Sequence, residues 1–346
     1  MRSSFVLILL AIALATPSVA LAQPIADEPA VAETASSSTT WILVTYSVLI
    51  VLSSMLGGWL PSILRLTHVR MQMLMSVVGG LMLGIGLFHL LPHGLHELGP
   101  GGIDRGVWWM VIGVVTMFLL IRMFHFHSHD VPDPEHDHDC DKAHGDDTQH
   151  SHSHGHHGHN HGTHELSWLG VFFGLSLHTL IDGLALGASI QADAAHGGGF
   201  RLFGLGTFAA IALHKPLDAI SITTLMKSAG WSRIWMNVVN AAFATMCPLG
   251  ALLFVFGLSK LGANQSVVIG CALTFSAGVF LCISLGDLLP EMEFHSHNRL
   301  QLSGLLIAGL AIAYGIGFLE PAHVHNHGHD PVEDTGHDHD HAGHDH

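Results

Sequence analysis

The chain has 346 residues, of which 49% are hydrophobic and 11% are charged, and its formal net charge is −15. A soluble domain carries about 25% charged residues, so the composition argues against a soluble globular protein. The acidic balance argues against nucleic-acid binding, and four Cys residues are too few for a disulfide scaffold.

The N-terminal segment 1–22 is typical of a secretory signal peptide. Arg2 supplies a positive charge, residues 5–14 are apolar, and Ala20-Leu21-Ala22 offers a small-x-small cleavage site. The alternative is an uncleaved first membrane helix, but this apolar run is shorter than the ~20 residues needed to span a bilayer. Residues 23–40 are rich in Ala, Ser, Thr and Pro and predict a disordered lead.

Long apolar runs follow, and each is long enough to cross a bilayer as a helix. They predict an all-α polytopic membrane protein with transmembrane helices 1–3 within 41–124, helices 4 and 5 within 167–226 and helices 6–8 within 235–319. The eight expected spans are 41–64, 71–95, 107–124, 167–190, 202–226, 235–259, 266–290 and 300–319.

The basic residues agree with the orientation that a cleaved signal peptide would impose. The mature N-terminus would lie outside the cytoplasm, and eight spans would return the C-terminus to the same side. The positive-inside rule then expects Lys and Arg to be enriched in the cytoplasmic loops. Seven lie at predicted inner positions (Arg65, Arg70, Arg122, Lys142, Lys227, Arg233, Arg299) and three in predicted outer loops (Arg105, Arg201, Lys260).

Histidine is concentrated in two low-complexity segments. The predicted cytoplasmic loop 125–166 holds 14 His, and the predicted outer tail 320–346 holds nine. Neither segment can form a packed core, so both are expected to be disordered. Imidazole and carboxylate together favour divalent metals, and we expect weak binding at many sites. A flexible polar linker without a ligand is the alternative.

Two predicted helices carry the same pattern of ionisable residues. The fourth has His178 and Asp182, the fifth has His214 and Asp218, and both read H-x-x-x-D. A spacing of four places His and Asp on one helical face. All four lie near the expected bilayer midplane, where ionisable groups are costly and usually functional. Facing each other, they would offer two nitrogens and two carboxylates to Zn²⁺.

Lys215 lies beside this predicted site. An ammonium group at the midplane would be costly unless it paired with Asp182 or Asp218. Its role is then either structural, or that of filling a place where a second cation would otherwise bind. Pro216 removes a helical hydrogen bond and would bend the fifth helix at the site.

An internal repeat relates the second and seventh expected spans. Residues 78–93 (VGGLMLGIGLFHLLPH) align with 276–291 (SAGVFLCISLGDLLPE) at a constant offset, and the two helices run in opposite directions. An inverted repeat is typical of secondary transporters. It places polar groups at both ends of a predicted cation pathway: His89 and His93 at the outer mouth, and Asp287 and Glu291 at the inner mouth.

On these residues, the chain resembles the ZIP (Zrt/Irt-like) family of divalent-metal permeases from about residue 41 to 319. The shared features are eight spans, a His-rich loop between the third and fourth, the paired motifs of the fourth and fifth, and the seventh-helix motif SAGVFLCISLGDLLPE. The resemblance implies a 3+2+3 bundle of inverted repeats around helices 4 and 5. It also implies metal ligands at His178, Asp182, His214 and Asp218, with a contribution from His89.

The chain departs from the family pattern at three positions. Thr179 stands where Asn is frequent, Asp218 where Glu is common, and Lys215 where members with two metals have an acidic or metal-binding residue. The last departure favours one metal in the core rather than a binuclear centre.

These observations predict a transporter that moves divalent metal ions, foremost Zn²⁺, into the cytoplasm, with no enzymatic activity and no prosthetic group. Fe²⁺, Mn²⁺, Co²⁺ and Ni²⁺ stay open as substrates because nitrogen and oxygen ligands suit them to different degrees. The expected location is a bacterial inner membrane with both mature termini outside the cytoplasm. The expected partners are metal ions and lipid, without nucleic acid, and a homodimer stays open.

Three rival functions remain. A cation-diffusion exporter also carries His-rich loops, but it usually has six spans. An intramembrane metalloenzyme is disfavoured because H-E-x-x-H is absent. A metal sensor or storage protein would explain the His-rich segments but not the polar pathway.

Overall fold

A computed structural model describes residues 32–63, 68–124, 167–196, 202–294 and 299–318. The predicted signal peptide 1–22, the His-rich loop 125–166 and the tail 320–346 lie outside these residues. By its contacts the chain divides into Met1–Ser36 and Ser37–His346. The packing described below is that of the second unit.

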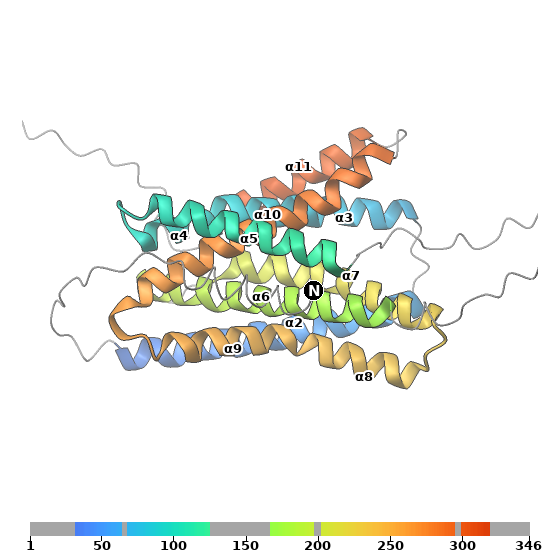
Figure 1. Ribbon diagram of the computed structural model, residues 1–346, viewed down its shortest axis with the longest axis horizontal. Coiled ribbons are helices and arrows are strands. Elements are labelled where there is room, and N and C mark those ends of the chain that lie inside the picture. The colour runs from blue at the N-terminus through green and yellow to red at the C-terminus, as the bar shows by residue number, and fades with distance from the viewer. Residues whose placement is uncertain (1–31, 64–67, 125–166, 197–201, 295–298, 319–346) are drawn as a thin grey trace, which may run out of the picture. The chain divides into compact units, whose positions relative to one another are not determined.

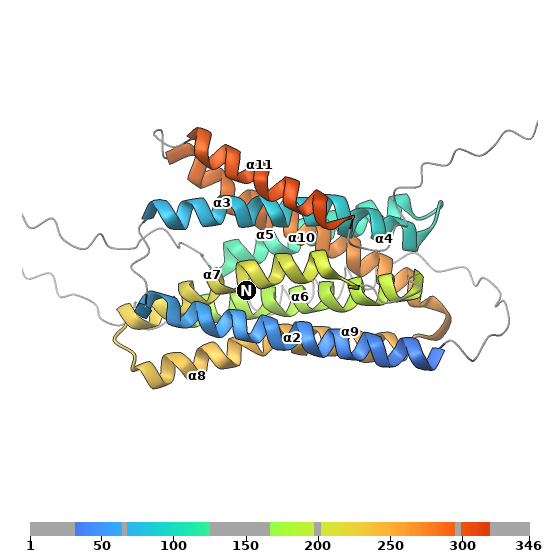
Figure 2. The ribbon, with the colours of Figure 1, turned by 180° about the vertical axis from the view of Figure 1, so that it is seen from behind.

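The described residues confirm the all-helical prediction, since every regular element among them is a helix (Figures 1 and 2). Eight helical rods match the eight expected spans in order, some of them built from two or more segments. They are α2 (Ala32–Ile63); α3 (His68–Ile85), η1 (Gly86–Leu90) and α4 (Leu91–Leu98); α5 (Ile103–Phe124); α6 (Ser167–His196); α7 (Leu205–Ser228); α8 (Arg233–Ala244) and α9 (Met246–Leu258); α10 (Gln265–Phe294); and α11 (Arg299–Ile316).

Six of these rods are long and apolar enough to cross a membrane. The other two expected spans are α7 and α11. In α7 the ionisable residues His214, Lys215, Asp218 and Lys227 lower the mean hydropathy, whereas α11 is apolar but shorter. Helix α7, whose ionisable residues make it less hydrophobic than the other spans, is therefore one of the two helices that carry the predicted metal site.

Two predicted boundaries shift by more than five residues, and the sixth predicted span is divided. Helix α2 begins at Ala32, so part of the segment 23–40, predicted to be a disordered lead, is helical; Ala32, Glu33 and Ala35 are compatible with this because Ala and Glu are good helix formers. Helix α6 extends to His196 rather than 190, which adds Asp193 to the helix. The predicted sixth span 235–259 is divided into α8 and α9 at Thr245.

Proline explains the interruption of the second span. Pro92 has no N–H, so it cannot donate to the carbonyl four residues earlier. The chain forms the short π-helix η1 just before it, in which the N–H of Leu91 donates to the carbonyl oxygen of Gly86, five residues back. Such π-turns often mark functional positions, and this one contains His89.

Glycine contacts support the inverted repeat. A Cβ on Gly80 would lie 2.2 Å from the Leu306 carbonyl oxygen of α11, and a Cβ on its repeat partner Gly278 would lie 2.0 Å from the Met110 carbonyl oxygen of α5. Helix α3 therefore packs closely on α11, and α10 on α5, through equivalent small residues (Figure 2).

The central helices are held by similar contacts. Gly183 of α6 and Gly250 of α9 face each other, so a Cβ on either would lie 2.1 Å from a backbone oxygen of the opposite helix. Helix α6 also contacts α7 and α10. The two helices that carry the H-x-x-x-D motifs are thus set between the two repeats.

Candidate metal centre

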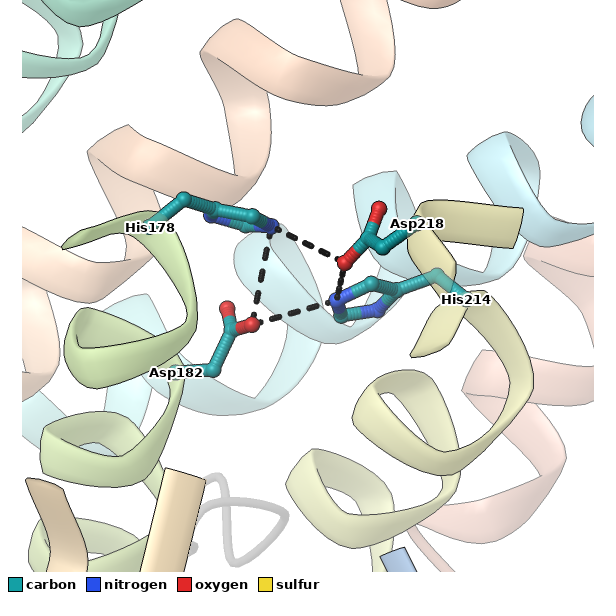
Figure 3. Close-up of side chains that lie close together, drawn as sticks. All are labelled: His178, Asp182, His214 and Asp218. Atoms are coloured by element: carbon teal, nitrogen blue, oxygen red, sulfur yellow. Dashed lines mark hydrogen bonds and ion pairs between the residues drawn. The ribbon is translucent and has the colours of Figure 1, made fainter. Parts of the chain in front are cut away.

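The four predicted ligands come together between α6 and α7 (Figure 3). One ligand atom from each of His178, Asp182, His214 and Asp218 lies within 4.8 Å of every other. The Nε2 atom of His178 lies 3.5 Å from Asp182 Oδ2 and 3.8 Å from Asp218 Oδ2, and His214 Nε2 lies 3.2 and 3.9 Å from the same two oxygens. Two nitrogens and two oxygens therefore face a common centre.

Helical geometry explains this convergence. Each His and its Asp are four residues apart on one helix, and α6 and α7 run in opposite directions. As a result, each Asp also lies within reach of the His on the other helix, and the shortest of these His–Asp distances is 3.2 Å, between His214 Nε2 and Asp182 Oδ2. The His178 and His214 rings are tilted by 33°, with centroids 5.5 Å apart.

A backbone contact orients one ligand. The Nδ1 atom of His214 lies 2.8 Å from the Ala210 carbonyl oxygen, which can only accept, so Nδ1 carries the proton. The lone pair of a neutral His214 ring is then on Nε2, which faces the centre. Contacts of this kind fix the tautomer of metal-binding histidines.

Two polar atoms of the cluster lack a hydrogen bond within the described part of the chain. These are His178 Nδ1 and Asp182 Oδ1, and both are buried. Most buried polar atoms in proteins are satisfied, so unsatisfied ones indicate a functional role or an additional bound species.

Lys215 contacts both carboxylates. Its Nζ donates to Asp182 Oδ2 at 2.6 Å and to Asp218 Oδ2 at 3.2 Å, and a third hydrogen bond of 3.0 Å reaches Thr179 Oγ1. The ammonium group also lies 5.5 Å from the centre of the Phe243 ring. Lys215 is fully buried, and it reduces the charge of the two carboxylates from −2 to −1.

Access to the cluster is uneven. The side chains of His178, Asp182 and His214 are at most 5% exposed, whereas Asp218 is 16% exposed. Asp218 is one turn nearer the Ser228 end of α7 than His214. The cluster is therefore more open on that side of the bundle.

The structure does not bring every predicted residue to this centre. His89 is buried, but it is outside the four-residue cluster and its Nε2 donates to the Ala313 carbonyl oxygen at 2.8 Å. His93 lies near His89 and faces Asp193 of α6. Asp287 and Glu291 belong to α10, but their side chains lie outside the described residues.

Sequence reasoning missed Asp193 and Ser53. Asp193 is 5% exposed and accepts a 2.7 Å hydrogen bond from the Gly204 N–H. Its signal was its position eleven residues after Asp182, on the same helical face, but the predicted span ended at residue 190. Ser53 of α2 donates a hydrogen bond to the Ala212 carbonyl oxygen of α7. No pattern in the sequence indicates this contact, because the two residues belong to different helices.

Known proteins give an independent comparison. The family model described as "ZIP Zinc transporter" matches residues 38–319. The chain is 32% identical over 131 residues to "Zinc transporter ZIP9-B" of Xenopus laevis, which covers 37% of this chain and 41% of that protein. It is 31% identical over 155 residues to "Zinc transporter ZIP9" of Micropogonias undulatus, covering 43% and 48%.

A third similarity, to "Zinc transporter ZIP1" of Homo sapiens, is 30% over 152 residues and covers 43% of each protein. In all three comparisons the matched region takes up less than half of the relative's own length.

Proposed function

The chain belongs to the ZIP zinc transporter family, and on this basis we propose that it moves divalent metal ions, foremost Zn²⁺, through the bilayer into the cytoplasm. The observation that carries the proposal is the buried cluster of two imidazoles and two carboxylates between α6 and α7. It lies inside a multi-pass helical bundle, where such groups are costly to bury without a function.

In this proposal His178, Asp182, His214 and Asp218 replace the water shell of the transported ion. Zn²⁺ suits this donor set because it accepts tetrahedral coordination by imidazole nitrogen and carboxylate oxygen. Separations of 3.2 to 3.9 Å between the nitrogens and oxygens need only small adjustment around one ion. Fe²⁺, Mn²⁺, Co²⁺ and Ni²⁺ remain candidate substrates.

We assign Lys215 the place of a second cation. Its ammonium group is already bonded to both carboxylates, so another divalent ion beside it would meet a fixed positive charge. We therefore expect the site formed by His178, Asp182, His214 and Asp218, called the core site below, to bind one transported ion at a time. Because Lys215 lowers the negative charge of the site, it also weakens the hold on the ion, which favours release.

The direction and location form part of the proposal. His89 and His93 would serve the outer mouth, and Asp287 and Glu291 the inner mouth. The distribution of Lys and Arg between the loops supports a cytoplasmic location for 125–166. A bacterial inner membrane with both mature termini outside agrees with the signal-like residues 1–22. The function proposed is transport without catalysis, in which His-rich segments buffer the ion.

An exporter, a metalloenzyme and a metal sensor or storage protein remain the competing functions. The cluster alone would suit any of them. Membership of the zinc transporter family favours import over export, and the sequence contains no H-E-x-x-H protease motif. The ion flux itself therefore decides between the alternatives.

The test is zinc flux into sealed vesicles that contain the purified full chain. Wild type should show saturable Zn²⁺ uptake, and the double variant His178→Ala/His214→Ala should lose it. The matched control His96→Ala removes an exposed imidazole of α4 and should keep full uptake. Saturable uptake by the double variant would refute the site, and no uptake by correctly folded wild type would favour a sensor or storage role.

A further inference from the structure

A further His–Asp pair joins α4 to α6, away from the core cluster of His178, Asp182, His214 and Asp218. The Nδ1 atom of His93 in α4 is 3.8 Å from Asp193 Oδ1, which is longer than a hydrogen bond. The side chains are 17% and 5% exposed, so the pair is largely enclosed. The nitrogen–oxygen separation lies within the 3.2–3.9 Å range found in the core cluster.

The other oxygen of Asp193 has a separate task. Its Oδ2 accepts the hydrogen bond from the Gly204 N–H, at the turn that leads into α7, where Gly204 has a φ of 66°. This bond fixes the carboxylate, so that Oδ1 is held toward His93. With Oδ2 bonded at the turn, Oδ1 is the oxygen that faces His93.

Polar side chains also lie between the pair and the core. On α6, Ser189 lies between Asp182 and Asp193 on the same face, and its Oγ accepts a 3.0 Å hydrogen bond from Thr207 Oγ1 of α7. Thr207 is in turn seven residues before His214. At 1.5 Å per residue, Asp193 is about 16 Å from Asp182 along the helix axis.

A buried apolar side chain also lies between the two places. Leu186 lies on the same face of α6, between Asp182 and Ser189, and is completely buried. The hydrogen of the Thr207 hydroxyl is donated to Ser189. Leu186 would therefore separate an ion held at His93 and Asp193 from the core cluster.

We propose that His93 Nδ1 and Asp193 Oδ1 form a second binding site for the transported divalent metal ion, loaded before the core site. This inference rests on the proposed transport function and adds a residue, Asp193, to the pathway. The partial exposure of His93 leaves positions for water in the coordination shell. Two protein ligands and several waters make a site that captures an ion and releases it readily.

The direct test is anomalous diffraction at the zinc edge from crystals of the full chain grown with Zn²⁺. We expect one peak between His93 and Asp193 and one at the core cluster. In Asp193→Asn the first peak should disappear and the second should remain. The amide oxygen of Asn can still accept from the Gly204 N–H, so the variant keeps the turn and removes only the anionic ligand.

The outcomes separate the two hypotheses. A peak at the core cluster without a peak between His93 and Asp193 (the outer peak) would overturn the second site and leave the proposed function standing. An outer peak without a core peak would support the second site and count against the core assignment. The absence of both peaks would overturn both, and persistence of the outer peak in Asp193→Asn would overturn the role of Asp193.

Transport kinetics give a second readout. Asp193→Asn and His93→Ala should each raise the KM for Zn²⁺ about tenfold, with kcat nearly unchanged. A decrease in metal affinity of about tenfold or more is typical when a metal site loses one of its supporting groups. The control Asp104→Asn removes an exposed carboxylate at the start of α5, at the same end of the bundle, and should leave KM unchanged. A loss of kcat at unchanged KM would show that the pair only holds α4 to α6, and would overturn the proposal.

Discussion

Ser53 of α2 donates a 2.6 Å hydrogen bond to the carbonyl oxygen of Ala212 in α7. Ala212 is four residues before Pro216, which lacks the N–H that would normally bond to this oxygen. The carbonyl oxygen that Pro216 leaves without its helical donor is therefore satisfied by a side chain from another helix. Gly57, one turn along α2, allows the close approach, since a Cβ there would lie 2.4 Å from Pro216 Cα.

Removing this hydroxyl should destabilise the protein. We expect Ser53→Ala to lower the free energy of unfolding by about 1 kcal/mol, because a carbonyl oxygen loses its partner. The adjacent Ser54→Ala is the control: the Ser54 hydroxyl is buried without a hydrogen bond among the described residues, so its removal should cost little. Thermal unfolding in detergent measures both, and equal effects would contradict the assigned role of Ser53.

Lys215 should matter most when no metal is bound. Lys215→Met leaves Asp182 and Asp218 without their cation, and breaking a buried ion pair in this way costs about 3–5 kcal/mol. Zn²⁺ supplies the missing positive charge, so it should stabilise the variant more than wild type. The measurement is the Tm of both proteins with zinc and with a chelator; an equal zinc-induced rise in both would refute this coupling.

Uptake should decrease at acid pH. Metal ligands must be unprotonated to bind, so metal binding releases protons. Protons and Zn²⁺ thus compete for the ligands of the core cluster, and the apparent KM should rise as the pH is lowered from about 7.5 to about 5.5. Initial uptake rates in vesicles with the same pH on both sides check this, and a constant KM over that range would argue against imidazole ligation.

Two glycines of α9 should respond in opposite ways to the same substitution. A Cβ on Gly250 would lie 2.1 Å from the Leu180 carbonyl oxygen, whereas a Cβ on Gly257 would meet no atom within 4 Å. We expect Gly250→Ala to force α6 and α9 apart and cost about 1–3 kcal/mol. Gly257→Ala should be neutral or slightly stabilising because Ala favours the helix. Comparable unfolding temperatures for the two variants would contradict the close packing of α6 on α9.

Hydrophobic length and residue spacing in the sequence determined much of the fold. Runs of about 20 apolar residues must form helices in a bilayer, because the backbone polar groups have no other partners there. The four residues of the core cluster were predicted because these spans are helical. His178 and Asp182 are four residues apart, as are His214 and Asp218, and this spacing places each pair on one face of its helix. The repeat of 78–93 at 276–291 relates Gly80 to Gly278, and in space the two glycines make equivalent close contacts, with Leu306 of α11 and Met110 of α5 respectively.

Only the tertiary structure decided how groups distant in sequence meet. It placed both carboxylates of the core cluster on one ammonium group, that of Lys215. It brought Ser53 to Ala212, and His93 to Asp193, from helices more than 90 residues apart in the chain. It also left His89 on the Ala313 carbonyl rather than in the cluster. Helical periodicity specifies which face of a helix is polar, but the packing of small residues such as Gly183 and Gly250 determines which faces meet and at what distance.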